Sequence, residues 1–337
     1  MTRVQQVLFR LEADYAGHPY YVPGNALYRA IASRVDAATR RALHVSHGVF
    51  FPGEYGEAPA WHSWSGSLGK VGSSLPPVER YDDLFLFRDA AQRWLKSSRP
   101  RDAHNAHPVQ EYGGRVAFGS KLWFGRPPEM RTSKRSVQWY VQCYLHAEPG
   151  SRDVIPVSEE ALDGVQVGGA RNYGFGVLSV VDSQVIDLDE VRYDRVEKAD
   201  DHVIELVSPF VLRSEFPEAD AQSVPWWWDV DASTLNGVTS RSRVDAGGDG
   251  LRRRAERLVV DGEVYGLETV DHGQIVGYAG NDPVGTARNG VLRVGSHSRF
   301  GFGELRIRPA SDDRVSGREV SRGSTGERGG VRARGGE

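Results

Sequence analysis

The stretch GGARNYGFGVLSVV, residues 168–181, places an Arg and an aromatic residue just before Gly-Phe-Gly and then alternates like a β-strand. A related stretch, GSHSRFGFGELRI, begins at Gly295. Glycine allows positive φ and a close approach of the backbone to a ligand. Successive exposed N–H groups form a concave anion site. The chain therefore carries the same local device twice, and each copy leads into a predicted strand.

The segments before the first glycine-rich loop indicate mixed helices and strands. Residues 4–15 alternate like a strand, and Pro23-Gly24 marks a turn. Asn25 is a candidate helix N-cap, and Leu27 and Ile31 begin an apolar helix face. A further helix is expected within residues 81–100, strands within 114–125 and 136–148, and a short helix near 156–167. The order predicts a β-α-β-β-α-β unit of the ferredoxin-like type.

The second half resembles a degenerate copy of the first. It begins with the strand HVIELVSPFVLRSEF and ends with the second glycine-rich loop and the strand GELRIRP. We therefore predict an α+β protein with two ferredoxin-like (RNA-recognition-type) domains that carry insertions, residues 1–197 and 198–310. Residues 311–337 lack apolar content and predict a disordered tail.

Composition limits the class of protein. The chain has 337 residues, 39% hydrophobic and 26% charged, with a net charge of −3. This balance excludes a uniformly basic nucleic-acid binder but allows a local basic surface. With the single cysteine Cys143 no internal disulfide is possible, and no apolar run reaches the length of a membrane helix. We expect a cytoplasmic protein without membrane contact.

Three interpretations of the glycine-rich loops compete. A phosphate-binding loop of nucleotide enzymes needs Lys and Ser or Thr at the start of a helix, and neither loop has them. A purely structural turn would place Phe175 and Phe302 in the core. RNA binding would use backbone amides and Arg for phosphates and aromatic rings for bases. The residues predicted to bind RNA in this way are Gly168, Gly169, Arg171, Tyr173, Gly174, Gly176, Gly295, His297, Arg299, Gly301 and Gly303.

The segments GGARNYGFG and VGSHSRFGFGELRI resemble the glycine-rich loops of the repeat-associated (RAMP) superfamily of CRISPR proteins. YYVPGNALYRAIASR is similar to the turn and helix that follow the first strand in several of its branches. The resemblance implies one or two ferredoxin-like domains and binding of CRISPR RNA in antiviral defence, with other effector subunits as partners. It leaves open whether the chain cuts precursor guide RNA, holds a guide end or forms the backbone of an effector complex.

Metal-independent RNA cleavage requires a base, an acid and a cation near the phosphate. His44 and His47 follow the first predicted helix, where processing enzymes of the family keep a catalytic His, and are the candidates; the alternative is a hydrogen-bonding role. Together with His104 and His107 they could form a zinc site, but we predict neither a metal nor a cofactor. Cys143 lies in a predicted strand and is expected to be a small buried hydrophobe.

Two further motifs suggest contacts with RNA or with partners. The cluster Arg252, Arg253 and Arg254 is the densest group of basic residues, and it is a candidate phosphate contact or a solvated face. Trp226–Trp228 cannot all be buried on one face of a strand, so we expect one or two to be exposed.

The predicted function is CRISPR RNA binding, with possible metal-independent cleavage of precursor guide RNA. One alternative is a non-catalytic backbone or end-capping subunit of an effector complex. The other is an unrelated β-rich binding protein with glycine hairpins.

Overall fold

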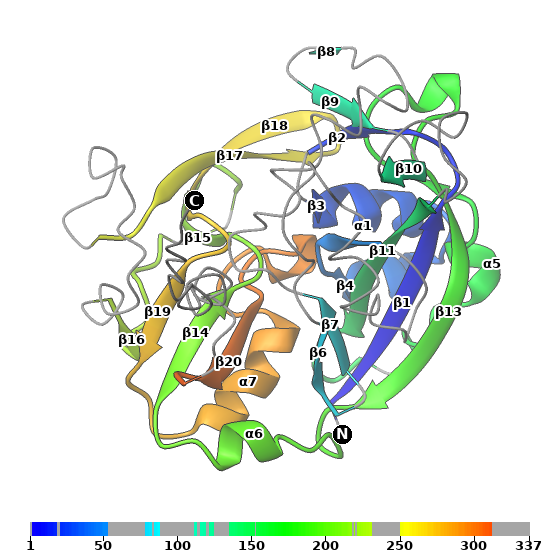
Figure 1. Ribbon diagram of the computed structural model, residues 1–337. Coiled ribbons are helices and arrows are strands. Elements are labelled where there is room, and N and C mark those ends of the chain that lie inside the picture. Colours follow the sequence, from blue (N-terminus) through cyan, green and yellow to red (C-terminus); the bar gives the residue numbers. More distant parts are fainter. Residues whose placement is uncertain are drawn as a thin grey trace, which may run out of the picture.

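The structure is a computed structural model in which two sheet-containing halves lie side by side (Figure 1). It describes residues 2–18, 21–52, 78–82, 84–87, 111–112, 115–118, 121–124, 135–151, 153–217, 219, 221–230 and 250–311. The predicted tail, apart from its first residue Ser311, lies outside these residues, as do His104 and His107. Among the described residues, no helix is long and apolar enough to cross a membrane.

The first half is built on an eight-stranded antiparallel sheet with the order β12-β13-β1-β11-β5-β3, in which β10 and β4 also pair with β11. Its strands are β1 (Arg3–Leu11), β3 (Tyr21–Val22), β4 (Leu43–Val45), β5 (Gly48–Pro52), β10 (Lys121–Phe124), β11 (Arg135–Ala147), β12 (Val165–Gln166) and β13 (Val177–Asp187). The register aligns Val7 with Cys143 on β11 and with Ser183 on β13. Long central strands give the sheet its curl (Figure 1).

Helix α1 (Gly24–Ala32) covers one face of this sheet. It starts after Pro23, and its buried residues Leu27 and Ile31 enter a core with Val7, Phe9 and Val141 from the strands, as four-residue spacing requires. The predicted helix is confirmed, but it begins at Gly24 with Pro23 at the N-cap position, so Asn25 lies inside the helix and is not its N-cap. The next helices are α2 (Ala37–Ala42) and α5 (Glu159–Leu162).

The second half holds two further antiparallel sheets. Their orders are β16-β19-β14-β20 and β15-β18-β17. The strands are β14 (His202–Leu206), β15 (Phe210–Ser214), β16 (Trp228–Asp229), β17 (Arg253–Val260), β18 (Glu263–Val270), β19 (Ile275–Tyr278) and β20 (Leu305–Pro309), with helices α6 (Asp194–Glu197) and α7 (Pro283–Leu292). A second core joins these elements to Val4, Tyr81 and Tyr144 of the first half.

Two small sheets complete the described elements. They have the order β2-β9-β8 and the pair β6-β7. Their bounds are β2 (Tyr15–Gly17), β6 (Val78–Tyr81), β7 (Leu84–Phe87), β8 (Glu111–Tyr112) and β9 (Arg115–Phe118). The helix expected within 81–100 begins instead with strand β7, and the residues beyond it lie outside the described part.

The predicted fold class, α+β with two ferredoxin-like domains, is wrong. The chain is mostly antiparallel β-sheet with a curled, half-barrel sheet. The physical reason lies in the helices: α5 and α6 have four residues each, about one turn, and cannot cover a sheet face as a ferredoxin-like unit requires. The sequence located α5 but not α6, and it did not reveal that most of the core would be built by strands. The domain boundary near residue 197 stays a prediction.

Candidate nucleic-acid interface

The two glycine-rich loops, loop 1 (168–176) and loop 2 (295–303), have the same backbone conformation. Each contains one turn of 3-10 helix, η3 (Arg171–Tyr173) and η5 (Ser298–Phe300). The residue before each turn is left-handed, Ala170 at φ 56° and His297 at φ 65°, and the residue after it is Gly174 or Gly301. The sequence repeat is therefore a structural repeat, residue for residue.

The last glycine of each loop is required by the backbone around it. The N–H of Gly176 donates to Asp14 O at 2.7 Å, and that of Gly303 donates to Pro209 O at 2.9 Å. A Cβ on either glycine would lie 1.9 Å from a backbone carbonyl oxygen, that of Val167 or Val294. Both glycines are buried, so their role in this structure is to close the loop. The predicted contact of these two glycines with RNA stays a prediction.

The arginines of the loops do not occupy equivalent positions. Arg171 is the first residue of η3, whereas Arg299 is the second residue of η5. Arg171 is exposed. The guanidinium of Arg299 donates to the carbonyl oxygen of Arg41 and is half-buried. The two arginines, which stand at different distances before Gly-Phe-Gly, thus have different surroundings: Arg171 faces solvent and Arg299 bonds to α2.

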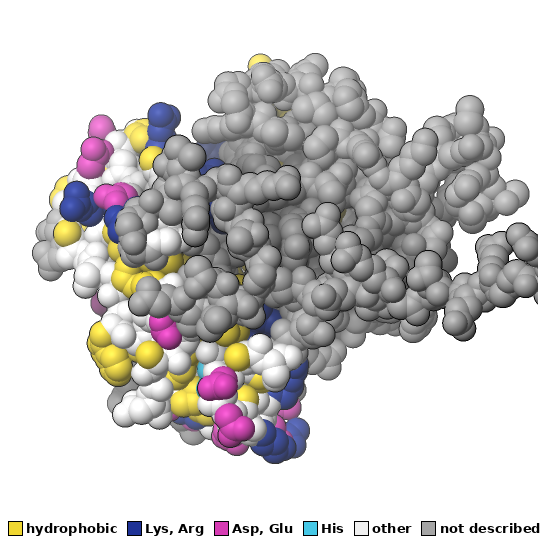
Figure 2. Space-filling model, turned by 60° about the vertical axis from the view of Figure 1, so that its left-hand side comes forward, with side chains coloured by type: hydrophobic (Ala, Val, Ile, Leu, Met, Phe, Trp, Pro, Cys, Tyr) yellow, Lys and Arg dark blue, Asp and Glu magenta, His cyan; other side chains and the backbone are white. Residues whose placement is uncertain are grey.

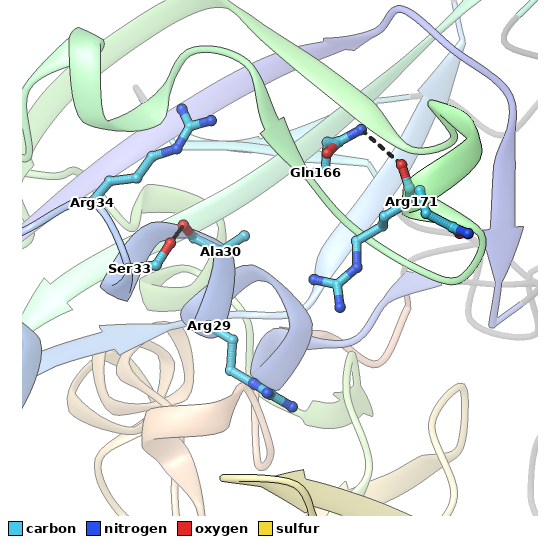
Figure 3. A pocket seen from close by; sticks show the side chains of 7 residues that line it. Arg29, Ala30, Ser33, Arg34, Gln166 and Arg171 are labelled. Atoms are coloured by element: carbon cyan, nitrogen blue, oxygen red, sulfur yellow. Dashed lines mark hydrogen bonds between the residues drawn. The ribbon is translucent and has the colours of Figure 1, made fainter.

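Loop 1 borders an open, cationic pocket of about 510 Å³ (Figure 3). Its lining comes from α1, β12 and loop 1 and comprises Arg29, Ala30, Ser33, Arg34, Gln166, Arg171 and Asn172. Among the residues that the structure describes, no carboxylate lines it. Arg34 is oriented by the carbonyl oxygens of Asp163 and Gly164, and Gln166 donates to Arg171 O at 3.4 Å. The pocket suits an anion with several oxygens.

An exposed aromatic residue follows the lining residue Asn172 in the chain. Tyr173, the last residue of η3, is 73% exposed. An exposed aromatic ring in a loop that also supplies Arg171 offers a base a stacking surface. Phe175 is half-buried.

Loop 2 is packed into the seam between the two halves. A Cβ on Gly301 would lie 2.2 Å from Nδ1 of His47, and one on Gly24 would lie 2.3 Å from the carbonyl oxygen of Phe300. Phe300 and Phe302 are 8% and 5% exposed. Nε2 of His297 lies 2.9 Å from Oγ of Ser214 on β15. These contacts give loop 2 a structural role in addition to any role in binding.

The two candidate catalytic histidines have different surroundings. His47 is 2% exposed, and its Nδ1 accepts the N–H of Gly24 at 3.3 Å. Burial lowers the pKa of His47 to about 3, with smaller contributions from His272 and Arg293. A neutral, enclosed imidazole that accepts a backbone hydrogen bond holds α1 and loop 2 together.

His44 is half-buried on β4, and its Nδ1 lies 3.4 Å from Oγ of Ser298 in loop 2. Burial, followed by the charges of Arg293 and Arg299, lowers the pKa of His44 to about 4. At neutral pH His44 is therefore a neutral base beside a hydroxyl and two guanidinium groups. Of the two histidines, His44 is the more accessible, although a pKa of about 4 makes it a weaker base than an ordinary histidine.

The predicted cluster of basic residues is paired with acids. Arg252 and Arg254 lie 2.9 Å and 3.8 Å from carboxylate oxygens of Asp271, and Arg253 lies 2.9 Å from Glu268. Arg254 also contacts Glu256 at 3.1 Å. The view of the second half shows basic and acidic side chains beside one another (Figure 2). The positive charges of these arginines are balanced by neighbouring carboxylates, so the structure gives no support to their predicted contact with phosphates.

Several residues of the interface were not found from the sequence. Arg29 and Ser33 are one helical turn apart on the exposed side of α1, a signal that helix periodicity contains. The rings of His18 and His272 lie near Tyr21 in the seam, with centroids 3.8 Å and 5.3 Å from it. These two histidines come from segments distant in the sequence, so no local pattern indicates their meeting.

Two predictions about single motifs are confirmed. Trp226 is 77% exposed and Trp228 is 5% exposed, so the three adjacent tryptophans are divided between surface and core. Cys143 is buried, and burial raises the pKa of its thiol to about 12. Among the described residues, no group of His, Cys, Asp or Glu could hold a metal ion.

No family model matches the chain, and no curated protein matches it.

Proposed function

We propose that this chain binds RNA through loop 1 and the cationic pocket beside it. The observation that carries the proposal is the pocket itself, which Arg29, Arg34 and Arg171 line without a carboxylate; Tyr173, the residue after the lining residue Asn172, is exposed. Phosphate oxygens would accept from the guanidinium groups, and a base would stack on the tyrosine ring. A net charge of −3 does not oppose this, since three arginines line this one pocket.

The finer proposal is that the RNA is a CRISPR guide or its precursor. It is supported by the resemblance of both glycine-rich loops to those of the RAMP superfamily. The antiparallel β architecture counts against it, because the resemblance implied ferredoxin-like domains. An end-capping or backbone subunit of an effector complex, and an unrelated β-rich binding protein, are the alternatives.

Cleavage is a second candidate activity because His44 lies beside loop 2. A neutral His44 would take the proton of a 2′-hydroxyl, the 2′-oxygen would attack the adjacent phosphorus to form a 2′,3′-cyclic phosphate, and the 5′-oxygen would leave with a proton taken from solvent water. Arg299 would stabilise the negative charge of the phosphorane. His47 is enclosed and is not proposed to act on RNA.

The test incubates purified protein with labelled repeat RNA from its own genome in EDTA and analyses the products on native and denaturing gels. We expect a shifted band that Arg171→Ala weakens and that the matched surface variant Arg195→Ala on α6 leaves unchanged. A single cut abolished by His44→Ala would add the cleavage activity. Equal binding by wild type and Arg171→Ala would refute the proposal for loop 1.

A further inference from the structure

Helix α1 lies between the two glycine-rich loops. Its first residue, Gly24, contacts loop 2 at Phe300 and Gly301, while Arg29 within the helix and Arg34 just beyond its end line the pocket with Arg171 of loop 1. At 1.5 Å per residue, the nine residues of α1 span about 14 Å. A single-stranded nucleic acid of a few nucleotides covers such a distance.

Helix α2 continues the connection from α1 to loop 2. The hydroxyl of Tyr28 on α1 donates to Arg40 O at 2.9 Å, and its ring packs on Phe300 with centroids 5.4 Å apart. The guanidinium of Arg299 donates to the carbonyl oxygen of Arg41. The last turn of α2 is therefore held against both α1 and loop 2.

The charge along this path has one dominant sign. Residues 24–42 contain the arginines Arg29, Arg34, Arg40 and Arg41, and Asp36 is their only acid. The carboxylate of Asp36 accepts from the backbone N–H groups of Ala38 and Thr39 and caps α2. The side chains of all four arginines are exposed, and the two bonds that Arg34 makes to carbonyl oxygens leave three of its five N–H donors for a phosphate.

We propose that loop 1, α1, the last turn of α2 and loop 2 form one continuous track for a single strand of RNA, with Arg40 and Arg41 as phosphate contacts between the two loops. This inference rests on the proposed function at loop 1. It extends that function by joining two separated loops into one binding surface. It also implies that a bound strand ends at Ser298 and Arg299, beside His44.

The test compares Arg40→Ala/Arg41→Ala with the control Arg195→Ala/Lys198→Ala, which removes two exposed cations from another short helix, α6, and the residue that follows it. Binding of oligouridylates of about 4 and about 12 nucleotides is measured against salt concentration. For the longer RNA we expect the α2 variant to lose about tenfold in affinity and its salt slope to fall by about 1.4, two single-strand phosphate contacts. The α6 control should match the wild type.

The shorter RNA separates the track from the pocket. We expect Arg171→Ala to weaken binding of both RNAs, while the α2 variant weakens only the longer one. If the α2 variant behaves like the α6 control on both lengths while Arg171→Ala still weakens binding, the track is refuted and the proposed function stands. If Arg171→Ala has no effect either, the proposed function itself fails. Thermal unfolding of each variant confirms that it is folded.

Discussion

Loop 1 and loop 2 share one backbone conformation and differ in what surrounds it. Around loop 1 the residues from Arg171 to Gly174 are exposed, whereas loop 2 is packed against α1 and His47, with Phe300 to Gly303 buried. One copy of the device is therefore free to meet a ligand, and the other holds the two halves together. A repeated motif fixes a local shape, and its neighbours determine how that shape is used.

The largest contrast should appear at the equivalent glycines Gly301 and Gly174. Both have positive φ, 93° and 83°, but a Cβ on Gly301 would lie 2.2 Å from Nδ1 of His47, and none of the surrounding atoms is within 4 Å at Gly174. We expect Gly301→Ala to lower the free energy of unfolding by about 3–4 kcal/mol. Gly174→Ala should lower it by about 1 kcal/mol, the cost of left-handed alanine. Urea denaturation measures both, and equal losses would contradict the buried position of loop 2.

The aromatic residues that end the two 3-10 turns form a second matched pair. Phe300→Ala should lower the free energy of unfolding by about 3 kcal/mol, since it removes a buried ring that packs on Tyr28. Tyr173→Ala should change stability by less than about 0.5 kcal/mol. Its effect should appear in RNA affinity, as a loss of about tenfold if a base stacks on the ring. A Phe300→Ala protein as stable as the wild type would contradict the structural role of loop 2. Unchanged RNA binding by Tyr173→Ala would contradict the binding role of loop 1.

Acid should act on the seam around loop 2, since loop 1 contains no histidine. Burial lowers the pKa of His47 to about 3, from an ordinary value of 6.5 that the unfolded chain retains. The unfolded chain takes up a proton as pH falls below 6.5, the folded protein does not, and stability is lost. Between pH 7 and pH 5 we expect His47 to account for a loss of about 2 kcal/mol. His146, whose pKa burial lowers to about 2, adds a loss of the same sign.

Chemical unfolding at several pH values checks this expectation. The variant His47→Gln, which can still accept a hydrogen bond, should show a shallower decline between pH 7 and pH 5 than the wild type. An equally steep decline in both proteins would mean that other groups govern the acid sensitivity.

The smallest effects should come from the loop arginines. Arg171→Ala should leave stability within about 0.5 kcal/mol of the wild type, because the side chain is exposed. Its RNA affinity should fall severalfold and its salt slope by about 0.7, the value for one phosphate of a single strand. Arg299→Ala should cause a similar change in slope only if RNA reaches loop 2. Filter binding over a range of salt concentrations distinguishes these results.

Much of the local structure followed from short patterns. The chain reversal at Pro23-Gly24, the buried face of α1 and the short helix α5 all lie where local patterns predict them. Short patterns did not predict that acids would pair with the cluster Arg252–Arg254. The partners Glu268 and Asp271 belong to a neighbouring strand and the turn after it. Charges close in sequence indicate a basic cluster only if nothing neutralises them across the sheet.

The fold class failed for a related reason. Hydrophobic alternation marks strands and helices one at a time, but the curl of a sheet depends on how many long strands pair and in which register. The Arg29–Arg34–Arg171 pocket likewise needs α1 and loop 1 to be neighbours in space. Neither the pairing of the strands nor the contact between α1 and loop 1 can be read from about ten consecutive residues.

The shape of the two loops was determined locally, because glycines at positive φ and a single helical turn depend on adjacent residues. Only the tertiary structure decided that Gly301 meets His47 while Gly174 meets solvent. The difference arises from contacts between residues that are hundreds of positions apart along the chain, and such contacts form only when the whole core is packed.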